Sequence, residues 1–361
     1  KTKKINLIRD RFGEKPLYLL TLQNNIFAFA SEIVSFNSIN FFSPSLDIRG
    51  LACFFNRGYI SAPLSIWEGV EKIMPGTNVE FTLQKDRKYH ITKKETYWSI
   101  RDIAVLGQKN LYGGSYEDCK SDLETIFLEV LEGQRLSDVP IGVFLSGGID
   151  SSIVAALVQQ ISSKKIKTFS IGFDNEMYDE SAYAEAIASH LNTEHITLKA
   201  KPSDALKLVE QMPNVYCEPF ADSSQIPTTL LSSLVKNHVS VALSGDGGDE
   251  IFSGYSRYIF AHNSQKFFLK SPYFLRRHLS NSIKLFSPEF LNLLGKKVNV
   301  SRLGDKAFKA SEVMLSEDFE SYYNKLISYW PNSTIVSTQN KIKNEFTNDL
   351  GSIENMMLAD Q

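Results

Sequence analysis

Residues 1–100 alternate apolar and polar positions over short runs, and a period of two places successive side chains on opposite faces of a strand. The runs are Tyr18–Thr21, Ile26–Ala30 and Asn78–Leu83. Turn residues separate them, as at Asn24–Asn25 and Pro75–Gly76. The pattern predicts antiparallel sheet, with a hairpin over 84–96, a short helix that begins at Ser31 and a second helix over Leu46–Arg57.

From Tyr116 the apolar period becomes helical, and strands and helices then alternate. The first helix carries Leu123, Ile126, Phe127, Val130 and Leu131 on one face. The predicted strands are 141–145, 167–173, 194–198 and 239–243. The predicted helices between them are 151–162, 179–191, 203–212 and 224–236. Strands separated by helices of this length form βαβ units, so we expect an α/β fold with a parallel sheet covered on both faces.

Residues 256–361 are rich in aromatic residues and helical in pattern, with breakers at Pro272, Pro288 and Pro331, which predicts a helical cap. Residues 101–115 predict a linker, because the stretch from Gly107 to Ser115 is rich in Gly and Asn. The chain is thus divided into residues 1–100, a linker over 101–115, and residues 116–361.

Composition agrees with two domains, because 361 residues with 43% hydrophobic content exceed one typical domain. Lys and Arg number 39 against 41 Asp and Glu, so the net charge of -2 gives no field to attract nucleic acid or a membrane. We expect small molecules or protein as partners. The 3 Cys residues form no C-x-x-C pair, which favours a reducing cytoplasm over a disulfide framework or a zinc site. No apolar run reaches the roughly 18 residues of a membrane span.

The strongest chemical signal is residues 141–152, Ile-Gly-Val-Phe-Leu-Ser-Gly-Gly-Ile-Asp-Ser-Ser. An apolar strand leads into a turn in which Gly147 and Gly148 permit a sharp bend and close approach of a ligand. The following helix directs backbone N–H groups at an anion, and Ser146, Ser151 and Ser152 add hydroxyls. No Lys stands in the turn, so this is not the loop that handles a transferred γ-phosphate. The expected chemistry is attack at the α-phosphate of ATP, with pyrophosphate as the leaving group.

A second turn of the same design follows a strand at residues 239–250, Val-Ser-Val-Ala-Leu-Ser-Gly-Asp-Gly-Gly-Asp-Glu. Both turns stand at carboxyl ends of strands, where open α/β sheets bind their ligands. Ser244 and Gly245 are therefore predicted beside the nucleotide, and Asp246 beside the activated acyl group. The competing interpretation of Asp246 is a turn residue with a local hydrogen bond.

Asp150 and Asp249 are the metal candidates, because Mg²⁺ is bound by one or two carboxylates together with phosphate oxygens. The alternatives are an acid favoured by the helix dipole for Asp150 and a solvated loop acid for Asp249. Leu145 and Ile171 end strands at the same sheet edge, so they either pair with adenine or belong only to the core.

Two further sets of polar residues were considered for a role in the chemistry. Asp222 or Ser223 is either a substrate contact or the N-cap of the next helix. The 6 His residues form no triad with any Cys, so a nucleophilic hydrolase within this chain is not expected.

These residues together resemble the glutamine-dependent asparagine synthetase family of the bacterial type, over essentially the whole chain. The N-terminal segments Arg9–Tyr18, Phe29–Glu32, Lys72–Gly76 and Tyr97–Trp98 are similar to the closing part and the exit of that family's glutaminase domain. The segments Ser146–Ser152, Leu243–Glu250 and Gly254–Tyr255 are similar to its ATP-side motifs. The resemblance implies a PP-loop ATP-pyrophosphatase synthetase domain with a helical cap, preceded by the last part of an antiparallel N-terminal-nucleophile glutaminase domain.

In that family, aspartate and ATP form a β-aspartyl-adenylate, which ammonia from glutamine converts to asparagine. Carried over by position, Leu145, Ile171, Ser244 and Gly245 bind ATP and Asp246 supports the adenylate. Two departures stand out. The family's N-terminal Cys with its glutamine pocket is absent, as is the Lys segment expected soon after Gln361, so the resemblance implies a fragment.

Two alternatives stay open beside this interpretation. The first keeps the chemistry but changes the acid, for example to a sugar uronate or a β-lactam precursor, because residues 215–228 contain no Arg for an aspartate carboxylate and include Pro227. The second is a nucleotide-binding scaffold without activity. The sequence also leaves open whether the protein forms a homodimer.

Overall fold

The computed structural model describes residues 3–22, 26–40, 42–174, 179–297, 300, 302–330 and 350–360. The chain divides into two compact units, each held together by its own contacts. The first unit contains Lys1–Lys109, Cys217–Ala221 and Ser253–Gln361, and the second contains Asn110–Tyr216 and Asp222–Phe252. The predicted division at 1–100, 101–115 and 116–361 follows sequence order alone and stays a prediction.

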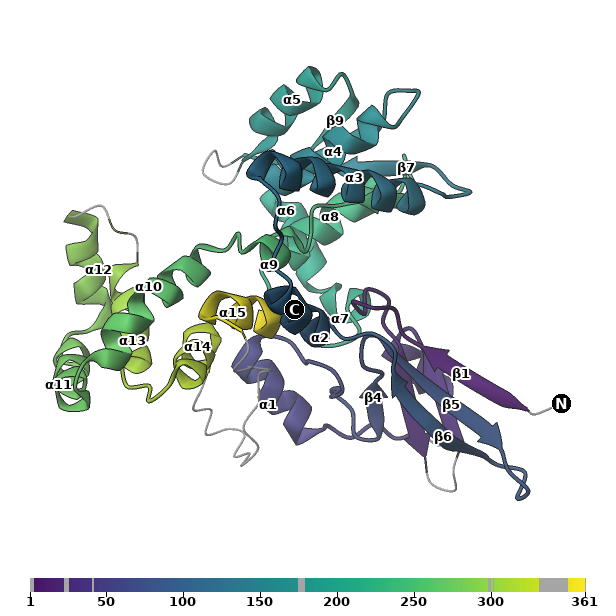
Figure 1. Cartoon of the computed structure of the whole chain (residues 1–361), viewed down its shortest axis with the longest axis horizontal. Helices are drawn as coiled ribbons and strands as arrows, with labels where there is room; N and C mark the ends of the chain where they lie inside the picture. The colour runs from purple at the N-terminus through teal and green to yellow at the C-terminus, as the bar shows by residue number, and fades with distance from the viewer. Residues whose placement is uncertain are drawn as a thin grey trace. The chain divides into compact units, whose positions relative to one another are not determined.

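The first unit contains two antiparallel sheets built from the alternating runs of the N-terminal region (Figure 1). One has the order β1-β5-β6, with β1 at Lys4–Ile8, β5 at Thr77–Leu83 and β6 at Tyr89–Thr96. The other has the order β3-β2-β4, with β2 at Tyr18–Leu22, β3 at Ile26–Ala30 and β4 at Val70–Lys72. The predicted strands and the hairpin over 84–96 are confirmed, whereas the turn at Asn24–Asn25 lies outside the described residues.

Two short helices lie where the sequence predicts them: the 3-10 helix η2 spans Ile33–Ser38 and helix α1 spans Ile48–Arg57. Helix α2 spans Ile100–Lys109, so most of it falls in the stretch 101–115 for which the sequence predicted a linker and no helix. Helix α1 begins at Ile48 because the Asp47 carboxylate caps it, accepting the N–H groups of Arg49 and Gly50. It ends at Gly58, whose φ of 82° is the left-handed conformation that glycine adopts without strain.

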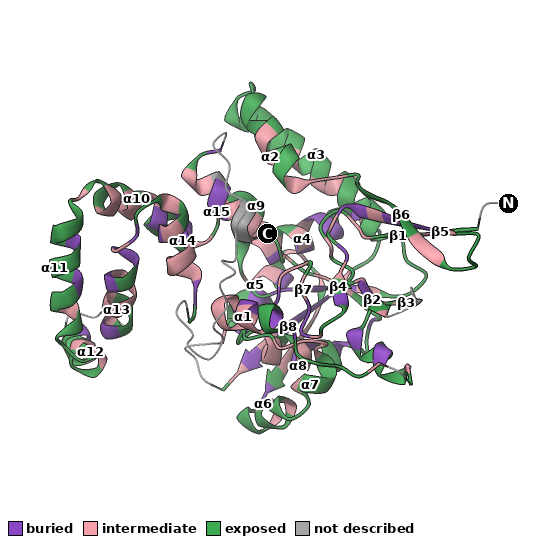
Figure 2. Ribbon diagram, turned by 90° about the horizontal axis from the view of Figure 1, so that it is seen from below, coloured by how far each residue is buried: buried purple, intermediate pink, exposed green. Residues whose placement is uncertain are grey.

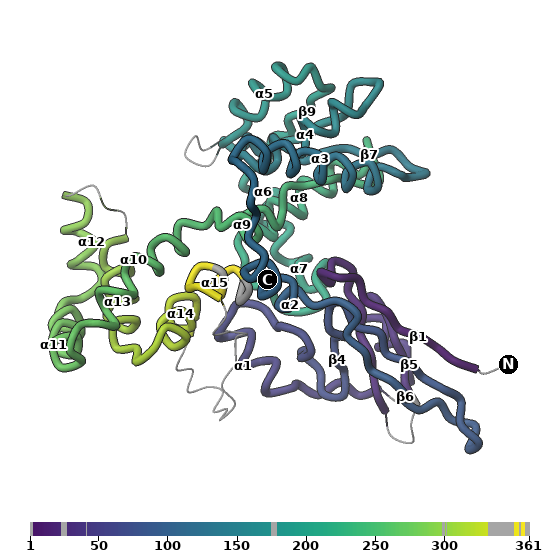
Figure 3. Tube along the Cα trace, in the orientation of Figure 1, coloured from purple at the N-terminus to yellow at the C-terminus, as the bar shows by residue number. Residues whose placement is uncertain are grey.

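The C-terminal region is helical, as predicted, and its helices follow one another along the tube in Figure 3. They are α10 at Ser256–Lys270, α11 at Tyr273–Lys284, α12 at Pro288–Lys297, α13 at Leu303–Val313, α14 at Phe319–Ile327 and α15 at Ser352–Asp360. Pro272 and Pro288 stand at helix starts, where a missing N–H does no harm, while Pro331 lies outside the described residues. Tyr258, Tyr322, Tyr323 and Met356 form the core of this region. Helix α11 is largely exposed, green in Figure 2.

The second unit contains a four-stranded parallel sheet of order β10-β7-β8-β9. The strands are β7 at Ile141–Phe144, β8 at Lys167–Phe173, β9 at Glu194–Ala200 and β10 at Val241–Leu243. The helices are α3 at Tyr116–Gln134, α4 at Ile149–Gln160, α5 at Ser181–His190, α6 at Pro202–Val209, α7 at Met212–Val215, α8 at Gln225–Val235 and α9 at Gly248–Phe252. The predicted α/β fold with a parallel sheet is confirmed.

Helices cover both faces of this sheet, as the nearly continuous apolar strands predict. On one face, Val143 and Leu145 pack with side chains of α3, α4 and α5. On the other face, Phe169 packs with Leu231, Val235 and Val239 on α8 and the segment after it. The strand β7 is buried between these two clusters, so the turn that follows it is anchored on a rigid strand.

Among the described residues, no helix is both long enough and apolar enough to cross a membrane. Cys53, Cys119 and Cys217 are all free thiols.

Replacing Phe169 with Ala tests the core of the parallel sheet. The ring is 0% exposed, so its loss leaves a cavity, and we expect the free energy of unfolding to fall by about 3 to 5 kcal/mol. Phe29→Ala is the matched control, because Phe29 also lies in a strand but is 50% exposed, and it should change stability by less than about 1 kcal/mol. Urea denaturation of both variants decides the point, and equal losses would contradict this core.

Candidate functional site

The order of the sheet places the two glycine-rich turns together. The chain runs from β7 through β8 to β9 on one side, and then returns to pair β10 with the other side of β7. The strand order therefore changes direction between β7 and β10, which makes this position a switch point of the sheet. Open α/β sheets bind ligands at such a point, beyond the carboxyl ends of their strands. Residues 145–148 leave β7 at this point, and residues 244–247 leave β10 beside them.

The first turn is held by its own serine residues. The hydroxyl oxygens of Ser146 and Ser151 lie 2.9 Å apart, and the Ser151 hydroxyl also accepts the N–H of Ser146 at 3.2 Å. The Ser152 hydroxyl donates to the carbonyl of Gly148 at 2.6 Å. Gly148 is the N-cap of α4 without a side chain of its own, so the first N–H groups of α4 open toward the turn. The predicted arrangement of strand, turn and helix start is confirmed.

Gly147 permits this turn to approach a neighbouring helix. Its φ is 86°, and a Cβ placed on it would lie 2.8 Å from Tyr183 Cβ and 3.2 Å from Ala184 N, both on α5. Any residue with a side chain would therefore strain the backbone and push against α5. The Gly at this position is required both by conformation and by space.

The second turn packs directly on the first. A Cβ on Gly245 would lie 2.6 Å from Ser151 N and 2.9 Å from Asp150 Cβ. A Cβ on Gly248 would lie 2.6 Å from Asp150 Oδ1. Gly245 and Gly248 therefore let the two turns touch, which brings Asp150 of the first turn beside the residue that precedes Asp249 of the second.

The remaining predicted residues have more varied surroundings. Asp246 is exposed and its Oδ2 accepts the Ser244 hydroxyl at 2.9 Å, so it makes a local bond within the turn. Leu145 is 1% exposed and its N–H donates to Phe169 O at 2.8 Å, so a backbone hydrogen bond from Leu145 to adenine would have to use its carbonyl oxygen. Ile171 lies near the end of β8 and packs against the α8 side of the sheet. Their roles toward ATP stay predictions.

The surroundings of the Asp150 carboxylate fit a magnesium ion held partly by a substrate, while the part of Asp249 stays a prediction. Among the residues that the structure describes, no three His, Cys, Asp or Glu side chains gather as a protein-only metal cage. Mg²⁺ does not require one, since it commonly takes one or two carboxylates and completes its shell with phosphate oxygens and water. The approach of the Asp150 carboxylate to Gly248 supplies an oxygen donor where the two turns meet.

A polar cluster lies between β8, β9 and α5, and it includes Thr168 and His195 near the amino ends of the two strands, away from the glycine-rich turns. His195 on β9 contacts the Thr168 hydroxyl through Nδ1 at 2.8 Å and the Ser170 hydroxyl through Nε2 at 3.1 Å. Thr197 extends the cluster to α5 by donating to Glu185 Oε1 at 2.8 Å. Burial lowers the pKa of His195 below its ordinary value, although the Glu185 charge acts in the opposite direction. Burial therefore favours the neutral imidazole over the charged one in the folded chain.

Sequence reasoning overlooked one buried carboxylate. Glu218 lies within the segment that was considered for substrate contact or capping, but its side chain forms an ion pair with Lys72 in the antiparallel region. Asp222, in the same segment, accepts the N–H of Ser224 at 2.7 Å, and Ser224 rather than Asp222 or Ser223 occupies the N-cap position of α8. The sequence shows only a Glu that precedes Pro219, and this does not indicate that the Glu218 carboxylate pairs with Lys72.

Comparison with known families matches two parts of the chain. Residues 122–360 match the sequence model described as asparagine synthase, and residues 1–98 match the one described as glutamine amidotransferase domain.

Individual relatives agree with these matches. A putative asparagine synthetase [glutamine-hydrolyzing] 2 of Methanocaldococcus jannaschii is 34% identical over 273 residues, covering 74% of this chain and 50% of the relative. Asparagine synthetase [glutamine-hydrolyzing] 1 of Bacillus subtilis is 32% identical over 254 residues, covering 69% of this chain and 37% of the relative. The chain thus spans half or less of the length of these relatives. Among solved structures, an NH3-dependent NAD synthetase from Campylobacter jejuni matches with 16% identity and a TM-score of 0.28, covering 38% of this chain and 60% of the other.

The close approach of Gly147 to α5 can be tested against a second glycine. Gly147 and Gly247 have similar positive φ angles, of 86° and 90°, but nothing lies within 4 Å of a Cβ on Gly247. Both Gly→Ala variants bear the backbone strain, whereas only Gly147→Ala has to displace α5. We expect Gly147→Ala to lower the free energy of unfolding by about 1 to 3 kcal/mol more than Gly247→Ala in urea titrations. Equal effects would show that the contact with α5 is unimportant.

The buried imidazole of His195 predicts a pH dependence of stability. Because its folded pKa is lowered, the unfolded chain binds more protons just below about pH 6.5, and stability decreases as the pH falls through that value. His195→Asn should remove this slope between about pH 7.5 and about pH 5.5, above the range where carboxylates titrate. Urea midpoints of both proteins across that range measure the difference, and an unchanged slope in the variant would exclude His195 as its source.

Proposed function

Because the chain belongs to the asparagine synthase family, we propose that it is part of a ligase that amidates a carboxylic acid, using ATP to activate the acid and glutamine to supply ammonia. The observation that carries this proposal is the contact between the turns after β7 and β10, through Gly245 and Gly248 against Asp150. Two glycine-rich turns in contact at a switch point suit an extended anion such as a triphosphate.

When the acid is activated, negative charge develops on the departing pyrophosphate, and the proposed residue roles follow from this. The carboxylate oxygen of the acid attacks the α-phosphorus of ATP, the bond to the β-phosphate oxygen breaks, and pyrophosphate leaves with its electron pair. The backbone N–H groups at the start of α4 and the hydroxyls of Ser146, Ser151 and Ser152 bind the departing pyrophosphate, with Ser244 and Gly245 on the opposite side. Leu145 and Ile171 are proposed at the adenine end.

Asp150 and Asp249 would hold Mg²⁺. A bound Mg²⁺ neutralises charge on phosphate oxygens, which these carboxylates alone would repel. The role of the chain is to keep the two carboxylates at the meeting point of the turns.

Amidation completes the reaction. Ammonia attacks the acyl carbon of the adenylate, loses a proton, and AMP leaves, so that ATP, acid and ammonia give amide, AMP and pyrophosphate. Asp246 is proposed beside the adenylate, where its exposed carboxylate can turn from Ser244 toward the ligand. The residues matched to the glutamine amidotransferase domain belong to the part that would release ammonia from glutamine.

Aspartate is the acid we propose first, with asparagine as the product. A different acid, such as a sugar uronate or a β-lactam precursor, is favoured by one observation: residues 215–228 contain no Arg to pair with the α-carboxylate of aspartate.

Free thiols at Cys53, Cys119 and Cys217 support a cytoplasmic location. A homodimer is compatible with this chemistry.

The full-length protein provides the test of this function. With ATP, Mg²⁺, ammonium and aspartate we expect AMP, pyrophosphate and asparagine in equal amounts, measured by chromatography. Formation of ADP and phosphate would contradict attack at the α-phosphate. A panel of other acids in the same assay identifies the acceptor if aspartate is not consumed, and absence of turnover with every acid would favour the scaffold alternative.

Asp150→Asn tests the metal assignment in the same assay. Removing one of two carboxylates should raise the Mg²⁺ concentration for half-maximal rate by about tenfold or more. Asp138→Asn is the matched control, because Asp138 is an exposed acid at the opposite end of β7. If both variants required the same Mg²⁺ concentration as the wild type, Asp150 would not be a ligand.

A further inference from the structure

An exposed aromatic side chain lies beside the first glycine-rich turn. Tyr183 belongs to the first turn of α5, and its side chain is 71% exposed. A Cβ placed on Gly147 would lie 2.8 Å from Tyr183 Cβ, so the Tyr183 side chain leaves α5 directly at this turn. Both residues belong to the unit with the parallel sheet, so their contact lies within one unit of the chain.

The start of α5 is fixed at the carboxyl edge of the parallel sheet. Asp179 Oδ1 accepts the N–H of Ser181, the residue at which α5 begins, at 3.0 Å. A Cβ on Gly172 would lie 3.4 Å from the same Oδ1 and 3.3 Å from Ser181 Oγ. Gly172 directly follows Ile171 near the end of β8. The start of α5 is therefore held next to the strand end that we propose beside adenine.

The buried face of α5 determines the direction of Tyr183. Ala184 and Ala188 are buried in the core cluster that also contains Leu145. Because successive residues of an α-helix are about 100° apart around its axis, Tyr183 is turned away from the face that Ala184 presents to the core. The contact with Gly147 shows that it is turned toward the first glycine-rich turn.

Packing within the chain leaves most of the Tyr183 ring uncovered. The ring is not part of the core cluster beneath α5, and its exposure means that it buries little apolar surface. Tyrosine is also a weaker helix former than alanine, so the ring does not favour α5 for its own sake. An aromatic face that is held in place at a nucleotide site and is open on one side can stack on a base.

We infer that Tyr183 is a nucleotide-binding residue whose ring stacks on the adenine of ATP. This inference rests on the proposed function, which places the pyrophosphate at the start of α4 and adenine near Leu145 and Ile171. The base then lies along the ends of β7 and β8, which are paired neighbours in the sheet. The Tyr183 ring borders this position from the α5 side, and it adds to the site a contact that carries no phosphate charge.

Nucleotide binding to the full-length protein measures this contact without turnover. Tyr183→Ala keeps the Cβ that packs at Gly147 and removes only the ring. In calorimetric titrations with Mg²⁺ and without an acid substrate, we expect the Kd of ATP and the Kd of AMP each to rise about tenfold. The Kd of inorganic pyrophosphate should stay within about twofold of the wild type, because pyrophosphate has no base. Tyr183→Phe keeps the ring and should bind ATP within about twofold of the wild type.

A control and three outcomes decide the point. Tyr116→Ala removes a ring that is 81% exposed at the start of α3 in the same unit, and it should leave all three Kd values unchanged. The inference is overturned if Tyr183→Ala binds ATP as tightly as the wild type does. It is also overturned if pyrophosphate binding weakens as much as ATP binding, because the variant would then have disturbed the turn. A wild-type protein that binds neither ATP nor pyrophosphate would instead remove the proposed function.

Discussion

Pairing of β10 with β7 is the constraint on which the candidate site depends. The two strands share only the register Val241↔Ile141 to Leu243↔Val143, yet this short ladder determines that the turns after them leave the sheet as neighbours. Gly245 and Gly248 then permit contact with Asp150 and Ser151 that no larger residue would allow. The chemistry assigned to this site is consequently a property of strand order as much as of the residues in the turns.

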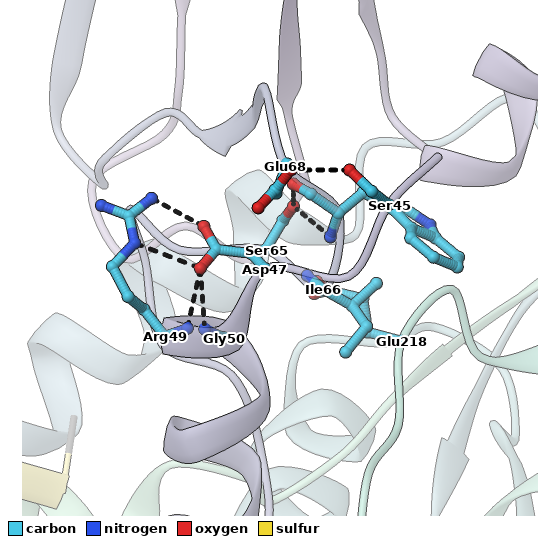
Figure 4. Close-up of polar contacts among 9 residues, drawn as sticks. Ser45, Asp47, Arg49, Gly50, Ser65, Ile66, Glu68 and Glu218 are labelled. Carbon is cyan, nitrogen blue, oxygen red and sulfur yellow. Dashed lines mark hydrogen bonds and ion pairs between the residues drawn. The ribbon is translucent and has the colours of Figure 1, made fainter. Parts of the chain in front are cut away.

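The local elements could be predicted because their signals are local. The apolar periods found each strand of the parallel sheet, and the glycine-rich sequences located both turns. The exact ends of the elements were predicted less well. The helix predicted from Leu46 begins at Ile48, because Asp47 is its N-cap (Figure 4), and the apolar pattern alone did not distinguish the cap from the helix. The general rule for parallel sheets placed both turns at the carboxyl edge, but the pairing of β10 with β7, which brings the turns into contact, was not predicted from the sequence.

Long-range partners were not accessible in this way. The N–H of Ile66 donates to the Glu218 carboxylate from 152 residues away, and an isolated Glu in a loop sequence carries no sign of the N–H or the ammonium that it will meet. The same is true of the C-terminal helices, whose contacts place them with Lys1–Lys109 and not with the parallel sheet that precedes them. A side-chain period indicates which face of a helix is buried, but not which part of the chain buries it.

The division of the chain into units has a consequence for synthesis on the ribosome. Most of the parallel-sheet unit is one continuous stretch from Asn110 to Phe252, so its strands can pair soon after they emerge. The antiparallel unit draws on both ends of the sequence, and Lys72 remains without its buried partner until Glu218 has been made. Lys72 and the residues packed around it therefore reach their final surroundings only after much of the parallel-sheet unit has been made, which lengthens the period in which chaperones have to protect them.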